Sequence, residues 1–282
     1  MTDLIWQPDV FAIGQTQFNV TEFEAWIDHN GFQAAKSPAT ETPLANLWAD
    51  VEDHDALERM IEFGGRHCYR AWQSGRDRDA YVRNIIEMEH GSVLEHSTIN
   101  WAIQGVSRSL SLELARHRVG IALSQESQRF VDASDIKFVV PPMVQFLNGG
   151  SMGETDLISD FAAECEHARL TYQLLQERIV ERIKATTPNI KSLTMIKKRA
   201  NEAARAHPPN AAETRFLWTT NMRLLRHFLW LRGGNGSDLE IRRLATWLLA
   251  IAQDSAPSVF HDMATSANDG EYGVPIIVSR VR

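Results

Sequence analysis

Residues 99–118 read INWAIQGVSRSLSLELARHR, and within them the hydrophobic pattern changes from that of a strand to that of a helix. At the start of this stretch apolar side chains alternate with small or polar ones, at Ile99, Trp101 and Ile103. A two-residue period is typical of a half-buried strand. Gly105 ends the strand, and Ser107 can cap a helix that continues to about Arg118. The sequence therefore predicts a strand that leads directly into a helix.

The rest of the chain has a mainly helical pattern. Helical spacing of apolar residues predicts helices at residues 22–30, 79–88, 156–184, 188–206, 222–231 and 239–253. Gly91 is the expected C-cap of the helix at 79–88. The sequence also predicts a loop at 36–43, a loop and short strand at 135–150, and a second strand at 213–220. Apolar residues from Leu44 to Val51 have helical spacing. Repeated alternation of strands and helices, which a parallel nucleotide-binding sheet requires, is missing. These patterns predict an α+β fold that is mostly helical with a small antiparallel sheet.

The composition is that of an ordinary globular chain. It has 282 residues, of which 44% are hydrophobic, and we expect a single domain at 1–282. A formal net charge of -7 argues against a nucleic-acid partner. The sequence has no basic region followed by an apolar run at its start, and no apolar stretch approaching the ~20 residues that span a bilayer. We therefore expect a cytoplasmic protein without a membrane partner.

The cysteines and histidines predict no metal site. Cys68 and Cys165 form no CxxC motif and no recognisable nucleophile motif, so both are expected to be structural. His90 and His96 flank the predicted strand, but no third ligand lies at metal spacing from them.

Cationic and hydrogen-bonding side chains are concentrated between Arg116 and Arg129. Arg116, His117 and Arg118 are consecutive, and they are followed by Ser124, Gln125, Ser127 and Arg129. Hydroxyls, an amide and guanidinium groups suit a phosphate monoester and the edge of a nucleobase. Two plainer interpretations stay open: basic residues that complement a helix C-terminus, and an ion pair between Glu113 and Arg116 three residues apart on that helix.

This segment resembles the signature of the flavin-dependent thymidylate synthases, in which Arg-His-Arg is followed by Ser-x-Arg after a short spacer. Further residues agree with that family in their order: His90, Ser92, Glu95, His96, Ser107 and Arg108 upstream, and Arg205, Pro209, Thr214, Asn221, Arg223, His227 and Arg232 downstream. The resemblance runs from about Arg66 to Glu240, within a family-like core at 66–256. Residues 1–65 add little to it.

The resemblance implies an unusual FAD-binding fold, which agrees with the lack of a Rossmann GxGxxG motif. It also implies a homotetramer in which each active site is shared between subunits. The implied reaction is the reductive methylation of dUMP to dTMP. In that reaction 5,10-methylenetetrahydrofolate is the carbon donor and FAD, reduced by NADPH, is the hydride donor, so the enzyme is a methyltransferase.

The resemblance assigns ligands to individual residues. FAD would contact Ser92, Arg116, His117, Arg118, Gln125, Asn221, Arg223 and His227. The substrate dUMP would contact Glu113, Arg116, Gln125, Ser127, Arg129, Arg205 and Arg232. By the same resemblance, Arg232 matches the arginine that stabilises a uracil ring deprotonated at N3, so it is the expected catalytic residue. A guanidinium suits that task because it stays cationic.

Several of these residues have a local alternative. Asn221 could cap the following helix, Arg223 and His227 could be a solvated pair on one helix face, and Arg232 could complement the helix dipole. The chain also departs from the family pattern: Glu113 stands where many members have glutamine, and the spacer before Ser127 is long. Two alternative functions stay open. The chain could be a flavoprotein without dUMP chemistry, or an RNA-binding module that uses the arginines of this region.

Overall fold

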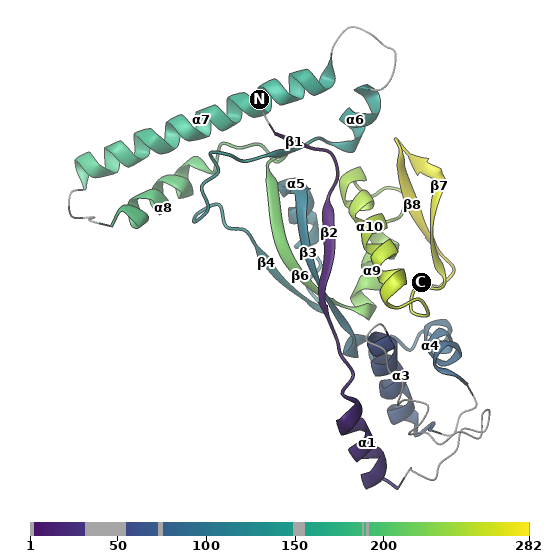
Figure 1. The fold of residues 1–282 in the computed structure, drawn as a ribbon. Helices are drawn as coiled ribbons and strands as arrows, with labels where there is room; N and C mark the ends of the chain where they lie inside the picture. Colours follow the sequence, from purple (N-terminus) through teal and green to yellow (C-terminus); the bar gives the residue numbers. More distant parts are fainter. Residues whose placement is uncertain are drawn as a thin grey trace.

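The computed structural model describes residues 3–31, 55–72, 76–148, 156–187, 189 and 192–281. The predicted loop at 36–43 and the helical spacing from Leu44 to Val51 lie outside the described residues. The architecture is α+β, as predicted, with helices packed around small antiparallel sheets (Figure 1).

A four-stranded antiparallel sheet lies at the centre of the molecule, in the order β2-β3-β6-β4. Its strands are β2 at Asp9–Gln15, β3 at Thr98–Ser107, β6 at Glu213–Asn221 and β4 at Ile121–Gln125. The predicted strands at 99–104 and 213–220 are confirmed as β3 and β6, the two central strands. The prediction that Gly105 ends the first strand is wrong, because Gly105 lies at an irregularity in the pairing and β3 continues to Ser107. The edge strands β2 and β4 were not predicted.

The inner face of the sheet is covered by α9 at Met222–Arg232 and α10 at Leu239–Ser255 (Figure 1). Trp101 and Trp218 are paired across β3 and β6, and both are fully buried in the core that includes these helices. The Trp101 indole N–H donates to the Thr220 hydroxyl at 2.9 Å, which satisfies the buried polar atom. Both predicted helices are therefore confirmed, with one face of each in the main core.

The opposite face of the sheet keeps apolar residues in contact with solvent. Phe11 on β2 is 54% exposed and Leu217 on β6 is 40% exposed. Both are paired with Ala102 on β3, so they lie on the same face of the sheet. A sheet normally buries its apolar face against another layer. In the described chain this face is available to a partner.

The helices α1 at Val20–His29, α3 at Ala56–Tyr69 and α4 at Arg78–Glu87 lie at one end of the sheet (Figure 1). The predictions at 22–30 and 79–88 are confirmed, but Gly91 as the C-cap is wrong. Met88 is the C-cap, and Glu89 takes the positive φ of 56° that a C′ glycine usually adopts. Gly91 begins the short 3₁₀ helix η3, Gly91–His96.

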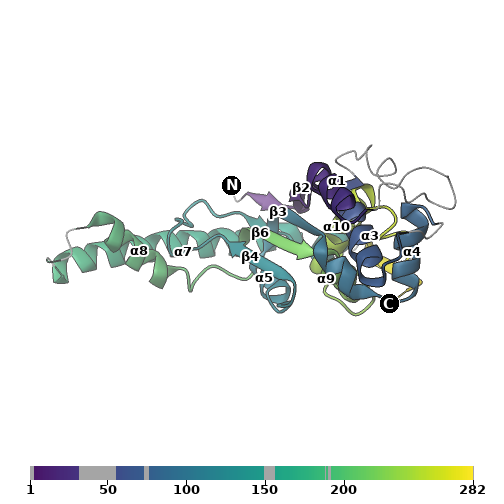
Figure 2. The same ribbon diagram turned by 90° about the horizontal axis from the view of Figure 1, so that it is seen from below.

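Two long helices extend away from the body of the molecule as a hairpin (Figures 1 and 2). They are α7 at Leu157–Thr186 and α8 at Leu193–Ala204, which confirms both predictions, although α8 starts later than expected because Ser192 caps it. Between the sheet and α7, β5 at Phe138–Val139 is the predicted short strand, and it pairs with β1 at Leu4–Ile5. The helix α6 at Pro142–Asn148 occupies part of the predicted loop.

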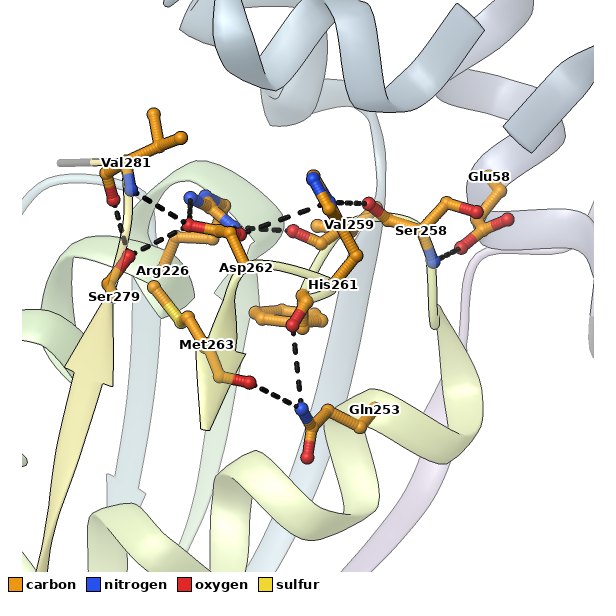
Figure 3. A network of polar contacts seen from close by, with 11 residues as sticks. Glu58, Arg226, Gln253, Ser258, Val259, His261, Asp262, Met263, Ser279 and Val281 are labelled. Carbon is orange, nitrogen blue, oxygen red and sulfur yellow. Dashed lines mark hydrogen bonds and ion pairs between the residues drawn. The ribbon is translucent and has the colours of Figure 1, made fainter. Parts of the chain in front are cut away.

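The chain ends in a hairpin that was not predicted, β7 at Met263–Glu271 and β8 at Val274–Ser279, packed against α9 and α10. One buried carboxylate joins its two ends to the core (Figure 3). Asp262 accepts hydrogen bonds from Arg226 at 2.7 and 2.9 Å and from the Ser279 hydroxyl at 2.8 Å. The ion pair is almost completely buried from solvent, since the side chain of Arg226 is 9% exposed and that of Asp262 is 2% exposed.

Within the described residues no helix is long and apolar enough to cross a membrane.

Replacing Asp262 with alanine leaves the buried guanidinium of Arg226 without its counter-charge. We expect this change to lower the free energy of unfolding by about 3–5 kcal/mol. Denaturant unfolding at one fixed protein concentration measures the effect. The control is Asp254→Ala on the exposed surface of α10, which should cost about 0.5 kcal/mol or less. Equal effects of the two changes would contradict the assignment.

The same ion pair predicts a loss of stability in acid. Burial opposes ionisation of Asp262, but hydrogen bonds and the positive charge of Arg226 outweigh it and lower its pKa below the ordinary value of 3.8. The stabilisation is therefore complete above 3.8 and is lost as the pH falls through the lower pKa of the folded state. The gap in unfolding free energy between wild type and Asp262→Asn should narrow only in that acidic range. A gap that is constant across it would refute this account.

Candidate functional site

The end of α5 differs from the prediction. The helix runs only over Arg108–Leu114, with the Ser107 hydroxyl accepting from the Leu110 N–H as the expected N-cap. Arg116, His117 and Arg118 therefore follow the helix in a turn and are not its last turn. The chain must reverse here into β4, and Gly120 adopts the positive φ of 76° that the reversal requires.

This turn brings the end of α5 to the end of α9. The carboxylate of Glu113 lies 3.1 Å from Nη1 of Arg232, so Glu113 joins two helices and the alternative of an ion pair with Arg116 is wrong. Nε of Arg232 donates to Nε2 of His117 at 3.0 Å. Three residues that the sequence assigned to the site, from separate parts of the chain, thus form one hydrogen-bonded group.

The hydrogen bond from Arg232 defines the protonation of His117. Because Nε–H of Arg232 is the donor, Nε2 of His117 has to be the unprotonated nitrogen of a neutral ring. Burial lowers the pKa of His117, and the positive charge of Arg232 and the nearby His227 lower it further. The ring also packs edge-on against Phe228, 5.1 Å between centroids. His117 is therefore an ordered acceptor for Arg232.

Gln125 is the last residue of β4, and its side chain contacts both α5 and β6. Its amide nitrogen donates to the Ser111 hydroxyl at 3.0 Å and to the Thr214 hydroxyl at 2.9 Å. Ser111 and Thr214 are both buried, so this contact joins β4, α5 and β6 in the interior. These two hydrogen bonds fix the orientation of the Gln125 side chain.

A second cationic group lies where the loop after β4 meets α8. Arg129 lies 3.4 Å from the carboxylate of Glu202. Desolvation would raise the pKa of Glu202, but Arg129, Arg199 and Arg205 together lower it. Burial, followed by repulsion from Arg205, lowers the pKa of Arg108. Several guanidinium groups therefore lie close together around one carboxylate, as an anion-binding site requires.

A cavity of about 450 Å³ lies between η3 and the exposed side of α9. Its lining includes two of the residues expected to contact FAD, Arg223 and His227, with Gly91, Leu94 and Trp230. Arg223 forms an exposed ion pair with Glu95 at 2.5 Å. A Cβ at Gly91 would lie 3.0 Å from Nε of Arg223, so the absence of a side chain there keeps the guanidinium against the backbone.

The other expected site residues are placed around these groups. Asn221 is the N-cap of α9, accepting from the Leu224 N–H at 2.8 Å, which confirms the local alternative for this residue. Ser92, Arg116, Arg118 and Arg205 are exposed, and Ser127 is half-buried. None of these positions contradicts a ligand contact.

Some residues of these groups were missed from the sequence. Glu202 was visible as a carboxylate three residues from Arg199 on the same helix, a spacing that allows pairing, and three residues before Arg205 at the C-cap. The contacts of Gln125 with Ser111 and Thr214 had no local signal, since Thr214 is separated from Gln125 by 89 residues.

Comparison with known proteins gives a consistent result. Residues 50–258 match the family described as thymidylate synthase complementing protein. The chain is 41% identical over 214 residues to the flavin-dependent thymidylate synthase of Mycolicibacterium vanbaalenii, covering 74% of this chain and 81% of the relative. It is 38% identical over 232 residues to that of Mycobacterium sp. strain JLS, covering 81% and 87%, and 37% identical over 232 residues to that of Mycobacteroides abscessus, covering 80% and 88%.

The contact between Arg232 and His117 predicts a change in histidine titration. Removing the guanidinium in Arg232→Ala removes a neighbouring positive charge and a donor that binds only the neutral ring. The pKa of His117 should therefore rise toward its ordinary value of 6.5. NMR titration of the histidine rings measures it, with the exposed Arg280→Ala as control. A pKa that stays the same or falls in Arg232→Ala would show that the contact is not formed in solution.

Proposed function

Because its similarity to these relatives spans most of the chain, the protein belongs to the flavin-dependent thymidylate synthase family, and we propose that it converts dUMP to dTMP. The proposed carbon donor is 5,10-methylenetetrahydrofolate, and NADPH is the proposed reductant of FAD. The observation that supports this best is the group of Arg232, Glu113 and His117. A separate cluster of arginines around Glu202 supports it further.

The arginine cluster suits the phosphate of dUMP. Arg129 and Arg205 lie around Glu202, and Arg108 lies beside Arg205. A phosphate monoester could exchange with Glu202 as their counter-charge, since charge-assisted hydrogen bonds to phosphate are strong. Arg116 and Ser127 would complete the contacts to this end of the substrate.

Arg232 is proposed to act on the uracil ring. Its carboxylate and imidazole partners hold the guanidinium in one orientation before the substrate binds, so little reorganisation is needed as negative charge develops on the ring. Glu113 would accept a hydrogen bond from the ring, and Gln125 would contact both ligands. The neutral state of His117 keeps it an acceptor for Arg232 and not a competing cation.

The residues around the cavity fit part of FAD. Arg223 and His227 provide donors for a pyrophosphate, and the Trp230 indole provides an apolar wall. Ser92, Arg118 and Asn221 would add polar contacts. When bound, the flavin supplies the hydride that reduces the transferred carbon to a methyl group. The chain's own residues would bind and orient the cofactor and exclude water.

No protein thiol is needed in this proposal. Cys165 lies in α7 within an apolar cluster with Phe138 and Ala212, and burial raises its pKa to about 11. It is a thiol at neutral pH and a poor nucleophile. Cys68 is exposed in the last turn of α3.

A homotetramer with shared active sites is part of the proposal. Phe11 and Leu217 lie on the sheet face that is exposed to solvent, and they would supply apolar surface for a contact between subunits. The exposure of Ser92, Arg118 and Arg223 fits a site that a second subunit completes.

The test is tritium release from dUMP labelled at C5, in the presence of FAD, NADPH and 5,10-methylenetetrahydrofolate. Wild type should release tritium only with the folate. Arg232→Ala should lose on the order of 100- to 1000-fold in turnover, as expected for a group that stabilises transition-state charge. Ser127→Ala should keep much of it, because Ser127 is proposed to bind substrate and not to attack it.

Arg280→Ala is the control, since Arg280 is exposed beyond β8. Normal turnover in Arg232→Ala would rule out the proposed role of Arg232. No release from wild type that still binds FAD would favour a flavoprotein with another substrate.

A further inference from the structure

The strand β8 contacts α9 at the residue that follows Arg232. The Ile277 N–H donates to the carbonyl oxygen of Gly233 at 2.8 Å. Gly233 is the C-cap of α9, with its own N–H bonded to the Leu229 carbonyl at 2.9 Å. The hairpin therefore binds a carbonyl group that the end of a helix leaves without an intrahelical partner.

Packing explains why residue 233 is glycine. Its φ of -81° is open to any residue, so conformational freedom is not the reason. A Cβ at Gly233 would lie 2.5 to 2.6 Å from Cδ1, Cβ and Cγ1 of Ile277. Such distances are far inside van der Waals contact, so β8 and the end of α9 touch as closely as their backbones allow.

A second contact fixes α9 two turns earlier. Arg226 is buried on α9 and bonds Asp262, which also accepts from Ser279 and from the Val281 N–H at 3.3 Å (Figure 3). The start and the end of the hairpin are thus joined to α9 through one carboxylate.

The two contacts flank the part of α9 that carries the proposed chemistry. His227 and Arg232 lie between the anchors at Arg226 and Gly233. Because a short helix is stiff, fixing it at both points also fixes the direction of the side chains between them. The hairpin lies beyond residue 258, where the family match ends.

We propose that the C-terminal hairpin β7–β8 positions Arg232, and that Ile277 is the positioning residue, acting through the last turn of α9. This rests on the proposed function, because it assigns the hairpin a role in the dUMP site. Ile277 itself touches Gly233 and is not a catalytic residue.

The chain offers a matched pair of substitutions to test this. Gly233→Ala places a Cβ against Ile277 and must displace the hairpin or the end of α9. Gly234→Ala makes the same change one residue later, where the nearest atom to a new Cβ is the Trp230 carbonyl oxygen at an ordinary 3.4 Å. Titration of the full-length protein with dUMP should show about tenfold weaker binding for Gly233→Ala, as for one lost hydrogen bond to a charged group. Gly234→Ala should bind as wild type does.

Two backgrounds separate positioning from a general loss of structure. In Arg232→Ala the additional Gly233→Ala change should not weaken dUMP binding further, because the affected side chain is absent. In Ile277→Gly, which removes the clashing atoms, it should also add nothing. Equal affinities of Gly233→Ala and Gly234→Ala, or a tenfold loss that persists in the Arg232→Ala background, would overturn the inference. Failure of wild type to bind dUMP would overturn the proposed function itself, and the inference with it.

Discussion

The burial of one face of α9 against the central strands β3 and β6 is the constraint on which the site depends. Phe228 and Leu225 are fully buried, and Phe228 lies 5.0 Å from Trp218 between ring centroids. With that face fixed in the core, the opposite face must direct Arg223, His227 and Trp230 outward to the cavity. The C-terminal end of the same helix then presents Arg232 to Glu113 and His117. A single packed helix thus connects the proposed flavin and nucleotide sites.

The scaffold also shows how charge is used in this acidic protein. Its net charge of -7 is no obstacle to anion binding, because arginines are gathered locally and their acidic neighbours are few and specific. Glu113 orients Arg232, while Glu202 and Glu95 pair with Arg129 and Arg223. We interpret the exposed pairs as contacts that ligands could replace, since such pairs contribute little to stability. The buried pair of Arg226 and Asp262 belongs to the scaffold.

Much of this arrangement could be predicted from sequence, and the exceptions have physical reasons. The strands β3 and β6 were predictable because buried residues alternate along them with less buried ones, and α9 and α10 because their apolar faces are broad. The edge strand β2 has little alternation, since Phe11 stays exposed, and β7 has mostly polar residues held by pairing with β8. The contacts of Arg232 join residues 115 and 119 positions apart, so no local spacing could have revealed them. The resemblance named candidate residues but could not give their geometry.

The most direct test of the account is a crystal structure of the full-length protein with FAD and dUMP bound. The account predicts the uracil ring against Arg232, the phosphate among Arg129 and Arg205, and the flavin nucleotide in the cavity beside Arg223 and His227. It also predicts that Gly233 and Ile277 remain in contact. Density that places the uracil ring of dUMP away from Arg232 would contradict it.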